Sequence, residues 1–226
     1  MARSQIKLSV IVPAFNEAET IALVLERVSA LELDTEIIVV DDSSTDRTLD
    51  AIIEADVSGV RVVEHPVNQG KGAAVRTGLA EASGDVIVIQ DADLEYHPND
   101  FLPMLKLIES GEARVVYGYR DFSSQRFLLR VGNQALTLLT NVLYGVAIRD
   151  METCYKMWRR EVLEGVTLQA DSFDLEVELT AAFVTAGEQI AQVPIRYEAR
   201  EEKKKLRWWV DGPEAVIKLI RYRFFQ

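Results

Sequence analysis

Acidic side chains stand directly after a short apolar run in this chain. Asp91, Asp93 and Glu95 follow a strand expected over residues 86–90. Carboxylate oxygens are the ligands that Mg²⁺ and Mn²⁺ prefer, and either metal also takes oxygens from a bound diphosphate. An Asp-x-Asp pair is also compatible with solvated loop acids or with a helix cap. Because this pair stands at the end of a strand, we favour a metal site formed by the three residues.

Two further motifs follow expected strands. Asp41 and Asp42 end the second strand, where a carboxylate can accept a hydrogen bond from a ribose hydroxyl or a base. Capping of the next helix is the alternative, and the two acids can divide these roles. Gly70-Lys71-Gly72 lacks the full Walker A spacing, which argues against a P-loop ATPase. A flexible turn explains its glycines, but Lys71 at a helix start is placed to meet an anion.

Alternating elements are expected to position these motifs. The predicted strands cover residues 8–12, 36–40, 60–64, 86–90 and 114–117, and the predicted helices cover 17–31, 46–56, 70–83 and 98–109. We expect Ser44 or Thr45 to cap the second helix. Strands that alternate with helices predict an α/β fold, a parallel sheet with helices on both faces. Ligands of such sheets bind beyond the carboxyl ends of the strands, which is where the motifs stand.

The pattern changes after residue 120. We expect a long apolar helix over residues 127–144, an acidic amphipathic helix over 172–186, a strand over 189–197 and a basic helix over 211–223. Arginines and lysines concentrate in this half, although the whole chain is acidic.

Composition limits the class of protein. The chain has 226 residues, a length that fits one domain, and a net charge of −11, which argues against a general nucleic-acid binder. Its one cysteine, Cys154, allows no intrachain disulfide, suits a reducing compartment and is expected to be buried. We find neither a signal-peptide pattern nor an apolar stretch of about 18 residues. We therefore expect a cytoplasmic protein that touches the inner membrane face at most peripherally.

Five stretches of this sequence together resemble family 2 glycosyltransferases, specifically the polyprenol-phosphate (dolichol-phosphate) sugar synthases. They are residues 9–17, 37–46, 68–74, 91–95 and 118–120, in the order expected for that family. The resemblance implies a GT-A fold in one domain over residues 1–226. Residues 1–120 would hold the nucleotide sugar and the metal, and residues 121–226 would hold the acceptor and end in a membrane-proximal helix.

The resemblance also implies residue roles. The side chains that would hold the nucleoside are Pro13, Phe15, Glu17 and Asp42. Asp91, Asp93 and Glu95 would hold the metal and the diphosphate, and Arg120 would contact the diphosphate. Lys71 joins this predicted nucleotide site as the cation at a helix start. The family often has Gln where this chain has Glu95, which leaves the choice between Mg²⁺ and Mn²⁺ open.

The second half matches the same branch more loosely. In the relatives, arginines at the start of the long helix meet the acceptor phosphate, and Arg126 and Arg130 stand there one helical turn apart. Solvent-facing arginines are the alternative. Lys203 to Lys205 precede Trp208 and Trp209, a combination that suits an anionic membrane surface, although core packing explains a tryptophan equally well.

The implied reaction is an inverting transfer of a hexose from a UDP- or GDP-sugar to a polyprenyl phosphate at the cytoplasmic membrane face. Asp93 and Arg120 would stabilise the leaving diphosphate. A phosphate acceptor is already largely a dianion at pH 7, whereas a hydroxyl acceptor needs a general base, for which Asp150 and Asp174 are candidates.

Three alternatives to this reaction stay open. A soluble hydroxyl acceptor would keep the enzyme class. A non-catalytic nucleotide-binding module is disfavoured by the intact acids. A nucleotidyltransferase is disfavoured because its glycine-rich loop should follow the first strand.

Overall fold

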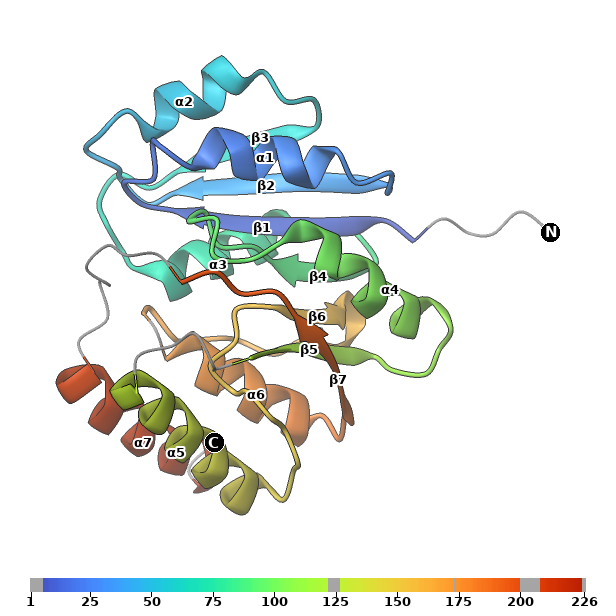
Figure 1. Ribbon diagram of the computed structural model, residues 1–226, viewed down its shortest axis with the longest axis vertical. Coiled ribbons are helices and arrows are strands. Elements are labelled where there is room, and N and C mark those ends of the chain that lie inside the picture. Colours follow the sequence, from blue (N-terminus) through green and yellow to red (C-terminus); the bar gives the residue numbers. More distant parts are fainter. Residues whose placement is uncertain (1–5, 122–126, 173, 200–207, 225–226) are drawn as a thin grey trace.

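The computed structural model describes residues 6–121, 127–172, 174–199 and 208–224, except for the side chains of 127–129 and 208–215 (Figure 1). Within these residues, one seven-stranded sheet has the order β3-β2-β1-β4-β6-β5-β7. The strands are β1 (Leu8–Ala14), β2 (Thr35–Asp41), β3 (Val60–Glu64), β4 (Val86–Ile89), β5 (Val115–Arg120), β6 (Lys156–Arg159) and β7 (Ile190–Ile195). The helices are α1 (Ile21–Ser29), α2 (Thr48–Ala55), α3 (Lys71–Glu81), α4 (Phe101–Glu109), α5 (Phe127–Tyr144), α6 (Leu175–Thr185) and α7 (Trp208–Phe224), with short 3₁₀ turns at Pro98–Asp100 and Arg160–Leu163.

Strands β1 to β4 pair in parallel, and β5 pairs in parallel with β7. Alternate residues of β2 pack on opposite sides, because successive side chains of a strand point to opposite faces. Ile37 and Val39 join the main core, whereas Ile38 and Val40 pack with Ala74 of α3. Both faces are therefore covered, and the predicted α/β sheet with helices on both faces is confirmed.

Strand β6 was not among the strands expected from the sequence. It lies between β4 and β5 and is antiparallel to both, which makes the sheet mixed. Only four residues long, it includes a lysine, Lys156, so it carries no apolar run that would predict a strand. Its place in the sheet is set by neighbours on both edges, which the local sequence does not contain.

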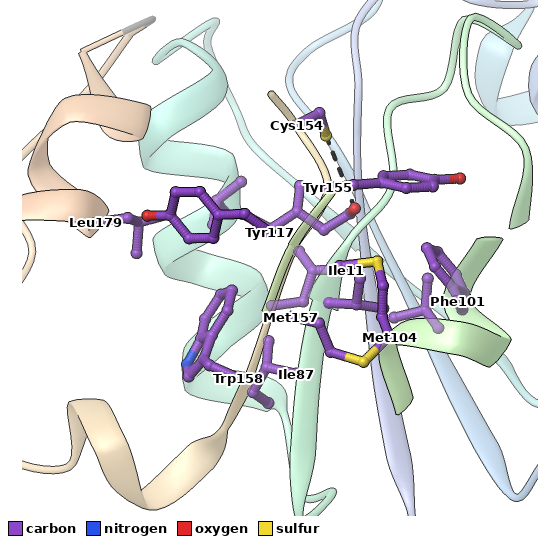
Figure 2. Close-up of a cluster of buried hydrophobic side chains, with 14 of the residues drawn as sticks. Ile11, Ile87, Phe101, Met104, Tyr117, Cys154, Tyr155, Met157, Trp158 and Leu179 are labelled. Atoms are coloured by element: carbon purple, nitrogen blue, oxygen red, sulfur yellow. Dashed lines mark hydrogen bonds between the residues drawn. The ribbon is translucent and has the colours of Figure 1, made fainter. Parts of the chain in front are cut away.

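The core continues across β6 (Figure 2). Tyr155 packs against Phe101 of α4, with ring centroids 4.9 Å apart. Tyr117 of β5 points the other way, toward Leu179 of α6, and its hydroxyl is 2.8 Å from the Thr180 hydroxyl. The two aromatic side chains thus anchor α4 and α6 to opposite faces of this part of the sheet.

Helix α6 corrects the expectation of an amphipathic helix. It spans Leu175–Thr185, and Glu176 and Glu178 are buried together with its apolar residues. Both sides are covered because α6 packs against the core on one side and α7 on the other: Lys218 of α7 pairs with Asp174 at 2.6 Å. The acidic residues of this helix therefore face the interior of the protein.

The start of helix α2 also differs from expectation. Neither Ser44 nor Thr45 caps it. The N-cap residue is Arg47, which makes no side-chain capping bond. The Thr48 amide and hydroxyl instead donate to the Asp46 carboxylate, at 2.9 and 2.5 Å. Ser44 and Thr45 bond to the loop after β1, so they link two loops at the same edge of the sheet.

Helices α5 and α7 lie side by side below the second half of the sheet (Figure 1). The Tyr144 hydroxyl donates to the Leu219 carbonyl at 2.9 Å, and Arg223 Nε donates to the Leu143 carbonyl at 3.0 Å. In the part of the chain that the structure describes, neither these helices nor any other is long and apolar enough to cross a membrane.

Candidate functional site

The loops after β1 and β2 are joined at the carboxyl edge of the sheet. The Asn16 amide donates to Ser44 Oγ at 3.0 Å, and the Thr45 amide donates to Asn16 Oδ1 at 2.8 Å. The Glu17 amide donates to the Thr48 hydroxyl at 2.8 Å. Three partly exposed residues of the predicted nucleoside site thus lie beside the end of β2: Pro13 at the end of β1, and Phe15 and Glu17 in the loop after it.

The carboxylate of Asp42 organises the next loop. It accepts hydrogen bonds from the amides of Gln69 and Gly70, each at 2.8 Å. His65 Nδ1 lies 2.7 Å from the same carboxylate, and His65 Nε2 lies 2.9 Å from the Thr77 hydroxyl. Both Asp42 and His65 are buried. The loop contacts of Asp42 are established, and its contact with a nucleoside stays a prediction.

The first acid of that pair, Asp41, has a different partner. Its carboxylate accepts from the Ser44 amide at 3.1 Å and from the Ser44 hydroxyl at 2.5 Å. The two neighbouring acids thus stabilise different loops: Asp41 bonds to the loop after β2, and Asp42 bonds to the loop before α3. A lone histidine after a strand belongs to no motif, so only the structure shows that His65 joins Asp42 to Thr77.

Gly70 and Gly72 are required by a close approach of two backbones. A Cβ atom at Gly70 would overlap the carbonyl of Asp171, and one at Gly72 would overlap the carbonyl of Ala170. The Gly72 amide donates to the Asp171 carbonyl at 3.0 Å. A carbonyl of the loop before α6 therefore accepts a hydrogen bond from an amide at the N-terminus of α3. The two glycines allow these segments from the two halves of the chain to pack closely.

Lys71 meets carboxylates from both halves of the chain. Its ammonium lies 2.9 Å from Asp91 Oδ1 and 3.1 Å from Glu176 Oε1, and all three side chains are at most one-fifth exposed. Burial alone would lower the pKa of Lys71, but Asp91 and Glu176 together raise it well above its ordinary value. In this structure, the anion that Lys71 meets at the helix start is this pair of carboxylates.

Asp93 and Glu95 continue the acidic turn after β4. The Glu95 amide donates to Asp93 Oδ1 at 3.0 Å, and Glu95 Oε2 accepts from the Tyr197 hydroxyl at 2.7 Å. Burial, reinforced by the negative charges of Asp91 and Glu95, raises the pKa of Asp93 to about 7. This turn concentrates more negative charge than Lys71 neutralises, so it favours a bound cation.

The described residues contain no cluster of three or more His, Cys, Asp or Glu side chains that converges on a metal position. Asp91, Asp93 and Glu95 thus do not form a closed cage. Their oxygen-only donor set fits Mg²⁺ or Mn²⁺, with further oxygens supplied by water or by a ligand such as a diphosphate.

Arg120 and Asp150 form a buried ion pair at the end of β5. Arg120 Nε donates to Asp150 Oδ2 at 2.7 Å, and a terminal nitrogen of Arg120 donates to Oδ1 at 2.9 Å. The guanidinium also lies over the Tyr197 ring, 5.1 Å from its centroid. Tyr197 thereby connects Arg120 with Glu95, so the predicted diphosphate contact lies next to the acidic turn.

The structure adds a buried group of charges that the sequence analysis did not select. Glu152 Oε1 and Glu176 Oε2 are buried and, among the described residues, have no hydrogen-bond partner. Burial and the charge of Glu176 raise the pKa of Glu152 to about 7. The fully buried Lys156 donates to the Met151 carbonyl at 2.8 Å, and burial lowers its pKa. Charged residues normally indicate exposure, so local sequence carries no signal for this buried group.

The predicted acceptor residues are only partly described. Arg126 lies outside the described residues, as do Lys203 to Lys205. Arg130 is an exposed residue of α5. Trp208 begins α7, but its side chain and that of Trp209 are outside the described part. Cys154 is buried, as expected.

Comparison of the sequence with models of known protein families identifies the family of this chain. Residues 9–167 match the family model described as Glycosyl transferase family 2. The chain belongs to that family. The predicted family resemblance is thereby confirmed, and the matched range contains the acidic turn after β4, Arg120 and Asp150 of this family 2 chain.

Two named relatives illustrate the match. A dolichol-phosphate mannosyltransferase of Pyrococcus furiosus is 34% identical over 189 residues, which cover 76% of this family 2 chain and 52% of the relative. A dolichyl-phosphate hexose transferase of Haloferax volcanii is 32% identical over 218 residues, covering 95% of this chain and 92% of the relative. The chain spans between about half and three-fifths of the length of the first three curated relatives, 51, 60 and 52%.

Solved structures agree with the GT-A fold predicted for this family 2 chain. Glucosyl-3-phosphoglycerate synthase from Mycobacterium tuberculosis, in complex with Mn²⁺ and uridine-diphosphate-glucose, superposes with a TM-score of 0.77 at 26% identity. The match covers 98% of this chain and 80% of that one. The same synthase has been crystallised with Mg²⁺ and uridine diphosphate. Both metals thus occur in structures of this fold.

Proposed function

We propose that this chain is a metal-dependent glycosyltransferase that moves a hexose from a UDP- or GDP-sugar to a polyprenyl phosphate. The observation that carries the proposal is the acidic turn Asp91–Glu95 beside the Arg120–Asp150 pair, at the carboxyl edge of the sheet, in a family 2 chain. Relatives named as dolichol-phosphate and dolichyl-phosphate transferases support this acceptor class.

The donor would lie across the carboxyl ends of β1, β2 and β4. Pro13, Phe15 and Glu17 would line the nucleoside, and Asp42 would order the adjoining loop. Asp91 and Asp93 would hold a divalent cation, which when bound supplies positive charge to the leaving diphosphate. Arg120, preorganised by Asp150 and Tyr197, would add a second positive charge near the same leaving group.

The ion pairs of Asp150 and Asp174 support a phosphate acceptor. Both oxygens of Asp150 accept from Arg120, and Asp174 pairs with Lys218. Either acid would have to break its pair to remove a proton from a hydroxyl. A phosphate monoester is already largely dianionic at pH 7 and attacks without losing a proton. Its charge would be met by Arg130 of α5 and by Arg126, which precedes that helix in the sequence.

A surface of α5 and α7 supports membrane contact. Leu138 and Val142 of α5 are 64% and 72% exposed, and Ile217 and Phe224 of α7 are 66% and 63% exposed. On each helix the apolar positions lie within one face, and exposed Arg221 and Arg223 stand among them on α7. We call the apolar residues of these two faces the α5–α7 surface. Exposed apolar side chains next to arginines suit a headgroup layer of anionic lipids.

A panel assay tests the proposal. The purified chain with Mn²⁺ or Mg²⁺ is incubated with UDP- and GDP-hexoses, with and without a short polyprenyl phosphate, and nucleoside diphosphate and lipid-linked sugar are measured. We expect one donor to give lipid-linked sugar, and we expect Asp93→Asn or chelation of the metal to reduce it by at least about 100-fold. Donor hydrolysis or transfer with no lipid product would refute the polyprenyl acceptor.

One observation favours a second candidate, a hydroxyl acceptor. The solved structures of this fold include glucosyl-3-phosphoglycerate synthase with phosphoglyceric acid, a small soluble acid. Glu152, whose pKa is raised to about 7, would be the general base for such an acceptor. Transfer to a soluble hydroxyl that is lost in Glu152→Gln would support this candidate, whereas transfer to a lipid phosphate that survives Glu152→Gln would support the first.

A further inference from the structure

The contacts of Lys71 place a cation where the proposed metal must bind. Its ammonium touches Asp91 Oδ1 at 2.9 Å and Glu176 Oε1 at 3.1 Å. Asp91 follows β4, whereas Glu176 stands on α6, 105 positions beyond Lys71. One ammonium thus joins a proposed metal ligand of the first half to a buried carboxylate of the second half.

A divalent cation bound by Asp91 and the ammonium of Lys71 would share one carboxylate and would repel each other across it. We propose that Lys71 is an internal competitor of the divalent cation at Asp91, and that Glu176 is the positioning residue that retains the ammonium when the cation enters. The inference rests on the proposed function, in which Asp91 is a metal ligand.

Glu176 has a free acceptor for the displaced ammonium. Its Oε2 atom is buried and, among the described residues, has no hydrogen-bond partner. When Asp91 turns to a divalent cation, the ammonium can replace the lost contact by bonding both oxygens of Glu176. A buried Lys71 would therefore keep a partner throughout, which avoids the cost of an uncompensated buried charge.

Lys71 also offsets part of the negative charge of the acidic turn. Asp91 and Glu95 repel the charge of Asp93, and Lys71 opposes that effect. The ammonium thus neutralises part of the turn until a divalent cation takes over. The affinity of the site for a divalent cation is then set by the difference between the free energies with which Asp91 binds that cation and the Lys71 ammonium. Removing Lys71 should therefore raise the affinity.

The test measures Mn²⁺ binding alone, by calorimetry and by the electron paramagnetic resonance signal of free Mn²⁺, without nucleotide or acceptor. Four variants of the full chain are compared with wild type: Lys71→Met, Glu176→Gln, the double variant and Lys106→Met. Lys106 is exposed on α4, so its variant controls for the loss of one positive charge. We expect Lys71→Met to tighten Mn²⁺ binding by about tenfold, a typical lower bound for close charge pairs, and Lys106→Met to leave it within about twofold.

Glu176→Gln should have the opposite effect on Mn²⁺ affinity to Lys71→Met. Among the described residues, Lys71 then keeps Asp91 as its one ion-pair partner, and Mn²⁺ binding should weaken by about fivefold. This loss should largely disappear in the double variant. Structural damage would weaken binding in both single variants. Equal or weaker Mn²⁺ binding by Lys71→Met, or an equal loss from Glu176→Gln in both backgrounds, would overturn the inference. Wild type that binds no Mn²⁺ and transfers no sugar would instead refute the proposed function.

Discussion

Arg120 and Asp150 are joined by two parallel hydrogen bonds of 2.7 and 2.9 Å, although 30 positions separate them in the sequence. The pair attaches the end of β5 to the loop before β6, and both side chains are almost fully buried, 7% and 0% exposed. A planar guanidinium held in this way cannot rotate freely, so its remaining surface has a fixed direction beside the acidic turn.

Replacing Asp150 by Asn should destabilise the fold, because it removes the negative charge that accepts both hydrogen bonds from the buried guanidinium. We expect the free energy of unfolding at pH 7 to fall by about 3 kcal/mol. Urea denaturation measures this, with Asp50→Asn as the control: Asp50 pairs with Arg47 on the surface, where both are more than half exposed. That control should cost less than about 1 kcal/mol. Equal losses in the two variants would contradict the structural role of the Arg120–Asp150 pair.

Glu36 should make the fold sensitive to acid. Burial alone would raise its pKa, but hydrogen bonds from Ser9, Ser83 and Lys7 lower it to about 2. The folded pKa lies below the ordinary value of 4.5, so the stabilisation is present above pH 4.5 and is lost as the pH falls toward 2. Glu36→Gln should therefore cost about 1–3 kcal/mol at pH 7 and much less near pH 2. Denaturation at pH 7, 4 and 2.5 tests this, and a pH-independent difference would disprove it.

Glu152 should give stability the opposite pH dependence to Glu36. Its folded pKa of about 7 lies above the ordinary value of 4.5, so the folded state keeps this proton longer than the unfolded state. Wild-type stability should fall as the pH rises from 4.5 to 7, and Glu152→Gln should remove that part of the decline. At pH 8 the variant should be more stable than wild type by about 1–2 kcal/mol. If the free energy of unfolding changed with pH in the same way in both proteins from pH 5 to 8, the pKa of Glu152 would not be raised.

The α5–α7 surface should govern vesicle binding. Burying an exposed Leu or Val side chain in a membrane interface contributes about 1.5–3 kcal/mol, so Leu138→Glu or Val142→Glu should weaken binding to anionic vesicles by at least about tenfold. Co-sedimentation with phosphatidylglycerol vesicles measures this. Ile53→Glu is the control, since Ile53 is 67% exposed on α2 at the opposite end of the molecule (Figure 1). A loss of equal size in the control would exclude a localised membrane contact.

Much of the first half could be predicted from local sequence. Apolar runs such as residues 86–89 are fully buried in a parallel strand, and their composition shows it directly. The positions of Asp91, Asp93 and Glu95 after β4 follow from the same run. The ends of helices were less accurate: the first helix begins at Ile21 and not at Glu17, and residues 18–20 form a turn in front of it.

Only the tertiary structure decided the partners of the charged residues. The sequence by itself determined which elements alternate and which side chains end the strands, since apolar periodicity and turn residues act over a few positions. It did not determine that β6 enters the sheet antiparallel, that Glu176 is buried, or that Lys71 bridges Glu176 and Asp91. Burial and ion pairing depend on surfaces that come together from distant parts of the chain, and these contacts arise only when the two halves pack.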